Sequence, residues 1–160
     1  MHVLSHDGNL VDAACIGVIA ALQHFRKPDT STEGEGVTVY TLEEREPVPL
    51  SILHHPYCVT FSFYGEGETS VLLDTTWLEE QVREGAVTIG INRHGEVCQI
   101  AKLGGVPVDA VVLLNCVQVA LVKVREISAF VGGKLEEDKR RRDKGGKLAE
   151  LLSSENDRVS

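Results

Sequence analysis

Three carboxylate side chains stand close together in the middle of the sequence, at Asp74, Glu79 and Glu80. Clustered carboxylates can bind a divalent cation or transfer a proton, so this segment is the first candidate for chemistry. The cluster has no partner at the spacing that a metal or proton-transfer site would need. A surface-facing loop is therefore the simpler interpretation.

The six histidines do not form a metal-binding pattern. His54 and His55 are adjacent, so on an extended segment they point to opposite sides and cannot share one ion. His6, His24 and His94 are expected in turns or at a helix end, where an imidazole is ordinarily solvated. The sequence also has no P-loop, no H-E-x-x-H and no G-x-S-x-G motif. We expect neither a metal nor a cofactor.

The four cysteines are Cys15, Cys58, Cys98 and Cys116. They are far apart in the sequence and form no C-x-x-C motif, which a zinc site or a redox pair would typically use. Each has apolar neighbours, so we expect buried free thiols in a reducing compartment.

Length and composition predict one globular domain, or one domain with a fragment and a tail. The chain has 160 residues, 42% hydrophobic and 25% charged, which excludes wholesale disorder and fibrous repeats. It has no apolar run of the roughly 20 residues needed to cross a bilayer. The first residues lack the basic flank and apolar stretch of a secretory signal, so we expect an intracellular protein.

The net charge of −8 is unevenly distributed. Residues 132–160 carry eight Lys/Arg and seven Asp/Glu, so the remainder of the chain is at −9. A body this acidic repels a phosphate backbone, which disfavours free-standing, tight nucleic-acid binding. The basic run 139–144 allows a nuclear address or an RNA-contacting arm, but its acidic neighbours favour a solvated, disordered tail.

The N-terminal part is predicted to contain a strand stub at residues 2–4 and a helix from Leu10 to Phe25. Asn9 can cap this helix, and Asp12 places a negative charge in its first turn, where the helix dipole favours it. The helix is apolar almost all round and must therefore be covered on more than one face. Too few strand residues precede it to form that cover.

The rest of the sequence is strand-rich and predicts an α+β unit of about four strands and one helix. Residues 37–40 form a short strand, and residues 43–50 form an extended connector. Gly104-Gly105 opens the long helix, which Gly132-Gly133 ends near Val131. The expected strands of the main sheet are 59–63, 70–74, 87–91 and 96–100.

Several segments indicate a particular protein family, which their pattern of apolar and polar residues alone does not. Residues 4–14 and 21–29 resemble the end of the first half of the RNase PH superfamily fold. Residues 43–52 resemble the linker of one non-catalytic subunit of the eukaryotic RNA exosome core ring. The likeness continues through residues 73–80, the strands near 87–91 and 97–100, and Gly104-Gly105.

The resemblance covers residues 4 to 131 and implies the second half of an RNase PH-like fold, preceded by the last helix of the first half. It implies that the chain is truncated at its N-terminus. The implied organisation is a first-domain remnant at 1–28, a linker at 29–48, a complete second domain at 49–131 and a charged, disordered tail at 132–160.

Active members of this superfamily degrade RNA from its 3′ end by phosphorolysis. They carry an Asp immediately before the strand that follows a D-x-x-x-x-E-[ED] segment. Aligning Asp74, Glu79 and Glu80 with that segment places Ala86 at the position of this Asp. A methyl group can neither bind a cation nor move a proton, and the basic phosphate-binding residues would lie largely in the missing part. The resemblance therefore implies a catalytically silent chain without catalytic, cofactor-binding or metal-binding residues.

The leading functional hypothesis is a structural, RNA-threading subunit of the exosome core ring. Implied partners are the other RNase PH-like subunits of a hexameric ring, the cap subunits, and single-stranded RNA in the assembled channel. The implied roles are rRNA maturation and RNA turnover in nucleus, nucleolus and cytoplasm. One alternative is an active phosphorolytic exoribonuclease using a displaced carboxylate at Glu79, Glu80 or Glu84. Another is an adaptor-like or non-functional domain whose first helix stays uncovered.

Overall fold

The computed structural model describes residues 2–33, 36–41, 44–65, 70–102 and 104–145. Its contacts divide the chain into two units, of which the first comprises Met1–Ala20 and Leu53–Phe130 and the second Ala21–Ile52 and Val131–Ser160. Helices α1 (Leu10–His24) and α3 (Ala110–Gly145) contribute to both units. Among the described residues, we find no helix both long and apolar enough to cross a membrane.

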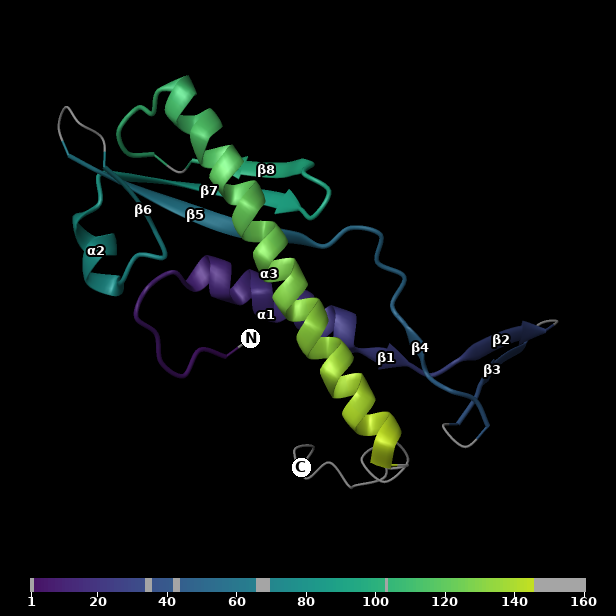
Figure 1. The fold of residues 1–160 in the computed structure, drawn as a ribbon. Coiled ribbons are helices and arrows are strands. Elements are labelled where there is room, and N and C mark those ends of the chain that lie inside the picture. The colour runs from purple at the N-terminus through teal and green to yellow at the C-terminus, as the bar shows by residue number, and fades with distance from the viewer. Residues whose placement is uncertain (1, 34–35, 42–43, 66–69, 103, 146–160) are drawn as a thin grey trace. The chain divides into compact units, whose positions relative to one another are not determined.

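A four-stranded antiparallel sheet forms the centre of the first unit (Figure 1). The strands lie in the order β6-β5-β7-β8, and each pairs antiparallel with its neighbours. The predicted strands and the α+β fold class are thereby confirmed. The bounds are β5 (Pro56–Tyr64), β6 (Ser70–Leu73), β7 (Gly85–Asn92) and β8 (Val97–Ala101).

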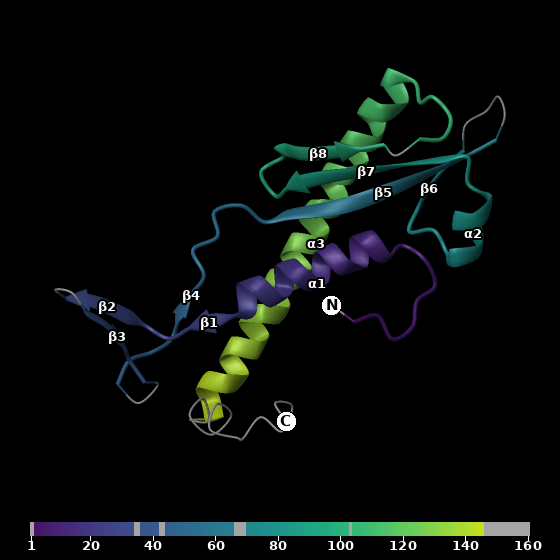
Figure 2. The same ribbon diagram turned by 180° about the vertical axis from the view of Figure 1, so that it is seen from behind.

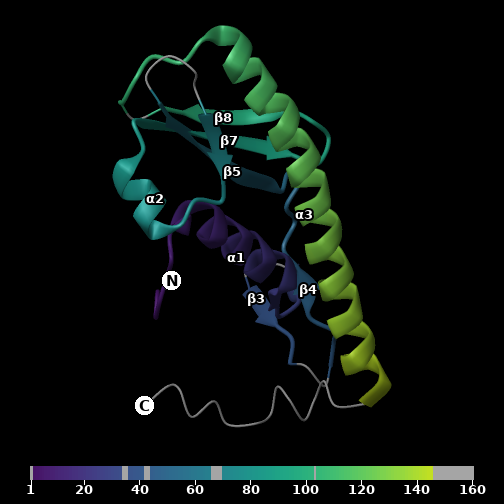
Figure 3. The same ribbon diagram turned by 60° about the vertical axis from the view of Figure 1, so that its left-hand side comes forward.

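One face of this sheet forms the hydrophobic core. The register pairs Val59 with Ile89 and Phe61 with Val87, and all four side chains are buried. Because side chains alternate along a strand, every second residue of β5 and β7 reaches this face. The first part of α3 runs along it (Figure 3) and buries residues four apart, namely Cys116, Ala120 and Val124.

The opposite face of the sheet carries small and polar side chains, among them Thr60 and Thr88, whose hydroxyls are 2.9 Å apart. The first part of α1 lies on this side (Figure 2). In α1 only Asp12 is buried, whereas Val11 and Val18 are 57% and 45% exposed. The described residues of the first unit therefore leave much of the apolar surface of α1 uncovered.

Two local predictions in the first unit are wrong. Residues 2–4 form no strand, and Leu4 is 99% exposed, because none of the described strands pairs with them. The segment predicted as a surface-facing loop forms helix α2 (Trp77–Val82) instead. The long helix begins at Ala110, where Asp109 accepts a hydrogen bond from Val111 N at 2.7 Å.

The second unit contains two short antiparallel ladders. β1 (Arg26–Lys27) pairs with β4 (Val48–Pro49), and β2 (Thr30–Glu33) pairs with β3 (Gly36–Val39), which confirms the strand expected near 37–40. Arg45 makes two further contacts within the second unit. The Arg45 guanidinium lies 2.9 Å from the Asp29 carboxylate and 3.8 Å from the centroid of the Tyr40 ring.

The helix end predicted at Val131 is also wrong, because α3 continues through Gly132-Gly133 to Gly145. Each helical glycine costs about 1 kcal/mol, but the sequence beyond is rich in good helix formers and oppositely charged residues one turn apart. Residues 146–160, which hold the rest of the predicted tail, lie outside the described residues. The ion pairs in this part of α3 are Lys134–Glu137, Arg141–Glu137 and Arg142–Asp138.

Candidate functional site

The turn that precedes α1 is interlocked with the turn that precedes α2. Gly8 has a φ of +94°, and a Cβ atom there would lie 2.3 Å from the Thr75 carbonyl oxygen, so only glycine fits. Trp77 N donates to the Asp7 carbonyl at 3.0 Å. The close approach brings Asn9 beside the carboxylate cluster that the sequence singled out.

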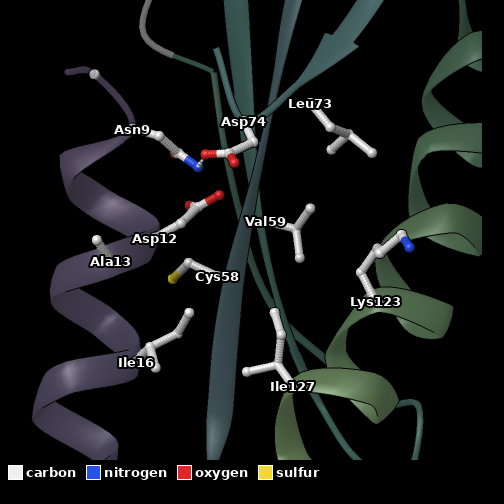
Figure 4. Close-up of a pocket in the computed structure, with 11 residues that line it drawn as sticks. Asn9, Asp12, Ala13, Ile16, Cys58, Val59, Leu73, Asp74, Lys123 and Ile127 are labelled. Carbon is white, nitrogen blue, oxygen red and sulfur yellow. Dashed lines mark hydrogen bonds between the residues drawn. The ribbon is translucent and has the colours of Figure 1, made fainter. Parts of the chain in front are cut away.

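The three carboxylates of the cluster each bind a group of the protein. Glu80 accepts a hydrogen bond from Asn9 N at 3.0 Å, and Asp74 accepts one from Asn9 Nδ2 at 2.9 Å (Figure 4). Glu79 accepts from both Thr76 N and Thr76 Oγ1, which completes a capping box at the start of α2. These hydrogen bonds hold the pKa of Glu79 below its usual value. Glu80 and Asp74 thus join the two turns through Asn9, while Glu79 caps α2.

Ala86 lies on β7, opposite Ser62 of β5, where it lines a pocket of about 450 Å³. Arg83 brings a positive charge to this pocket, and its guanidinium lies 3.5 Å from the Glu80 carboxylate. Glu84 lines the pocket as well. The position that the resemblance assigns to a catalytic Asp thus faces acidic and basic groups but carries only a methyl group.

Asp12 has a structural role that the sequence did not indicate. Its Oδ2 and Oδ1 atoms accept hydrogen bonds from Thr60 N and Thr60 Oγ1, both at 2.7 Å. Burial raises the pKa of Asp12, against the hydrogen bonds from Thr60, which lower it. Asp12 lies in the first turn of α1 as expected, and its carboxylate is in addition the buried link between α1 and β5. Its partner lies 48 residues away, so no local pattern could have identified it.

A second pocket, of about 380 Å³, lies between α1, β5 and α3 (Figure 4). Asp12 and Asp74 line its polar end, while Ile16, Val59 and Ile127 make the remainder apolar. Lys123 also lines the pocket, but its ammonium group pairs with Glu126 at 2.9 Å. The pocket combines apolar walls with carboxylates that already bind protein groups.

The described histidines and cysteines do not gather into a metal-binding group. His24 Nε2 lies 3.0 Å from the Asp138 carboxylate, and His54 lies 3.8 Å from that of Glu96. In the described ranges, no three His, Cys, Asp or Glu side chains are grouped so as to hold a metal ion. All four cysteines are free, but the predicted burial is correct in full only for Cys116, and Cys98 is exposed on edge strand β8.

Two family models match this sequence. The model described as 3′ exoribonuclease family, domain 1, matches residues 1–28, and the model of domain 2 of the same family matches residues 54–123. The chain belongs to the RNase PH family of 3′ exoribonucleases. Since α1 lies in the first match and the sheet in the second, the Asp12–Thr60 contact joins parts of both RNase PH domains.

Curated relatives carry the name of one exosome subunit. Exosome complex component RRP45 of Bos taurus is 46% identical over all 160 residues of this chain, which cover 36% of that protein. The Saccharomyces cerevisiae protein of the same name is 42% identical over 169 aligned residues, covering 99% of this chain and 54% of the relative. These matches confirm the narrower resemblance, which is to one subunit of the eukaryotic RNA exosome: ribosomal-RNA-processing protein forty-five, the RRP45 of these relatives. This RNase PH chain spans between about a third and a half of the length of these relatives.

A solved structure shares the RNase PH fold. It is described as the Archaeoglobus fulgidus exosome with RNA bound to the active site, and its matching chain is 25% identical with a TM-score of 0.62. The match covers 80% of this chain and 45% of the archaeal chain. The implied fold, with a helix of the first half followed by the sheet and long helix of the second, is thereby confirmed.

Proposed function

We propose that this RNase PH chain acts as part of a structural, RNA-threading subunit of the RNA exosome core ring. The subunit supports 3′–5′ RNA processing and turnover, including rRNA maturation, without catalysis of its own. Support comes from relatives named exosome complex component RRP45, one of which aligns with the whole chain at 46% identity. The shared fold with a chain of an archaeal exosome supports the same assignment.

The proposal that the subunit has no catalytic activity rests on the uncharged side chain of Ala86. Phosphorolysis brings two anionic groups together and needs a carboxylate to manage a proton or a divalent ion at the leaving oxygen. Ala86 supplies no such group, and the nearby Glu80 carboxylate is already bound to Asn9 N and Arg83. Releasing Glu80 for proton transfer would leave Asn9 N without its partner.

The partners follow from the same assignment. We expect the subunit to bind other RNase PH-like exosome subunits in a hexameric ring, together with cap subunits, and to contact single-stranded RNA only in the assembled channel. The acidic net charge of −8 favours RNA contact that is shared with partner chains over binding by this chain alone. Such a subunit would work in the nucleus, the nucleolus and the cytoplasm.

An active phosphorolytic exoribonuclease is the alternative function, because Glu80 and Glu84 line the same pocket as Ala86. In that reaction inorganic phosphate attacks the terminal phosphodiester, and the bond to the preceding ribose oxygen breaks to release a nucleoside diphosphate. Glu79 is the poorest candidate for the acid, since both Thr76 donors bind its carboxylate.

A phosphorolysis assay separates the two functions. Purified chain is incubated with single-stranded RNA, phosphate and magnesium, beside a variant carrying Glu79→Gln, Glu80→Gln and Glu84→Gln. We expect both proteins to release nucleoside diphosphates only at background level. Release that the wild-type chain supports and the variant loses would overturn the proposal of catalytic silence.

Membership of the assembly is tested in cells. A full-length version of the protein is tagged and purified under mild conditions, and co-purifying proteins are identified by mass spectrometry. We expect the other exosome subunits in near-stoichiometric amounts. A purification that recovers the tagged protein without any of them would refute the structural role.

A further inference from the structure

Two cysteine thiols from different RNase PH domains meet at the junction of α1 and β5. Cys15 lies on α1, and its Sγ donates to the Pro56 carbonyl at 3.6 Å. Cys58 lies two residues after Pro56 on β5 and lines the same pocket as Cys15. Its side chain points toward α1 (Figure 4). Both thiols are free and only partly buried.

A small oxidant can reach this pair of thiols. Cys15 and Cys58 both line a pocket of about 400 Å³, whose walls include Val18, Ile19 and Gly90. Gly90 pairs with Cys58 across the sheet and has no side chain to fill the space beside it. The pocket is far larger than a molecule of hydrogen peroxide, since a water molecule occupies about 30 Å³ in the liquid.

We propose that Cys15 and Cys58 form a reversible disulfide when the chain meets a peroxide. The Cys15 thiolate attacks one oxygen of hydrogen peroxide, and the O–O bond breaks to give a sulfenic acid and, after protonation, one water. The Cys58 sulfur then attacks the Cys15 sulfur. The S–O bond breaks, and its hydroxide leaves as a second water with the Cys58 proton. Two thiols lose two electrons, and the peroxide gains them.

The environments of the two thiols assign their order of reaction. Burial, together with the hydrogen bond to Cys15, raises the pKa of Cys58 to about 12. About one Cys58 side chain in 10⁵ is then a thiolate at pH 7, so Cys58 is a poor first nucleophile. Cys58 therefore acts second, against the sulfenic acid on Cys15.

The disulfide would reinforce an existing contact between the two RNase PH domains. Cys15 lies one helical turn beyond Asp12, and Cys58 lies two residues before Thr60 on β5. The new covalent bond would run beside the Asp12–Thr60 hydrogen bonds and restrain the same helix. Oxidation would thus fasten α1 to the sheet.

Peptide mapping of the oxidised chain tests the proposal. The full 160-residue chain is reduced, treated with hydrogen peroxide, alkylated to block remaining thiols, and digested without reductant. We expect a linked pair of peptides containing Cys15 and Cys58, lighter by two hydrogens than the separate peptides and released by dithiothreitol. The link should persist in Cys98→Ser and Cys116→Ser and be absent from Cys15→Ser and Cys58→Ser.

Hydrogen exchange gives a second measurement on the wild-type chain, which does not depend on the folding of any variant. We expect amide exchange in α1 to slow at least severalfold after oxidation and to recover after reduction. The proposal is overturned if Cys15 and Cys58 remain open to alkylation while Cys98 alone is oxidised. It is equally overturned if the dominant disulfide joins Cys98 residues of two copies.

Discussion

Replacing Asp12 tests whether its carboxylate holds α1 to the sheet. In Asp12→Ala, Thr60 N loses its acceptor, whereas Thr60 Oγ1 keeps the Thr88 hydroxyl 2.9 Å away. One partly buried donor without a partner costs about 1–3 kcal/mol. We therefore expect the free energy of unfolding to fall by about 1–3 kcal/mol, measured by urea denaturation followed by circular dichroism.

Asp12→Asn is the matched control. The amide oxygen can still accept from Thr60 N, and the amide nitrogen can donate to Thr60 Oγ1 if that hydroxyl turns its proton toward Thr88. The variant also removes a buried charge. We expect it to cost less than about 1 kcal/mol. Equal losses in Asp12→Asn and Asp12→Ala, or no loss in either, would refute this account of the contact.

Wild type and Asp12→Asn should also differ in how their stability depends on pH. Burial raises the pKa of Asp12 in the folded chain above its ordinary value of 3.8, so the folded state binds the proton more readily than the unfolded state. The part of the stability that comes from protonation of Asp12 is therefore fully present below pH 3.8 and is lost as pH rises through the folded pKa. Wild type should gain stability relative to Asp12→Asn as pH falls from 7 toward 4. A relative loss would contradict the sign of this shift.

Three further predictions concern two glycines, the reactivity of Cys58 and the exposed side of α1. Gly8→Ala should lower the free energy of unfolding by about 2 kcal/mol or more, because its Cβ would meet the Thr75 carbonyl at 2.3 Å, whereas Gly132→Ala, whose Cβ meets nothing within 4 Å, should raise it by up to about 1 kcal/mol. Urea denaturation of both checks the opposite signs. Alkylation of Cys58 by iodoacetamide should be slower than that of exposed Cys98 and should accelerate about tenfold per pH unit from pH 7 to 10, since the pKa of Cys58 is raised to about 12. Mass spectrometry of timed samples measures both rates, and a plateau below pH 9 would contradict the assignment. The native chain should bind a hydrophobic dye or self-associate through α1, and Val11→Ser with Val18→Ser should reduce either signal. Dye fluorescence and sedimentation of wild type decide this, and a clean monomer without dye binding would count against an uncovered helix.

The strands of the sheet were predictable because their signal is local. Phe61 and Phe63 alternate with Ser62 in a stretch bounded by turn residues, and this alternation alone indicates a strand with one buried face. The end of α3 was not predictable in the same way. A Gly132-Gly133 pair usually ends a helix, but here the charged pairs that follow one turn apart continue it.

The candidate site depended on contacts that no local pattern contains. The capping box at Thr76 and Glu79 was visible in the sequence as T-x-x-E and could have identified α2. The hydrogen bond between Asn9 N and Glu80 joins residues 71 apart, and only the folded chain reveals it. Whether a carboxylate of the cluster is available for chemistry thus depends on hydrogen bonds between residues far apart in the sequence, and these contacts are the least predictable.

The contacts of Glu80 set a physical conflict between structure and catalysis. To act as a general acid or base, Glu80 would exchange a proton with substrate, and its protonated form would lose most of the attraction to Arg83. The hydrogen bond from Asn9 N would weaken as well, although it helps hold the turn at the start of α1. Catalytic use would therefore loosen the contact between the two RNase PH domains during every cycle. A carboxylate at position 86 would avoid this conflict, because residue 86 lies on β7 and takes no part in the contacts of Glu80 with Asn9 N and Arg83. With alanine there, Glu80 keeps its contacts with Asn9 N and Arg83.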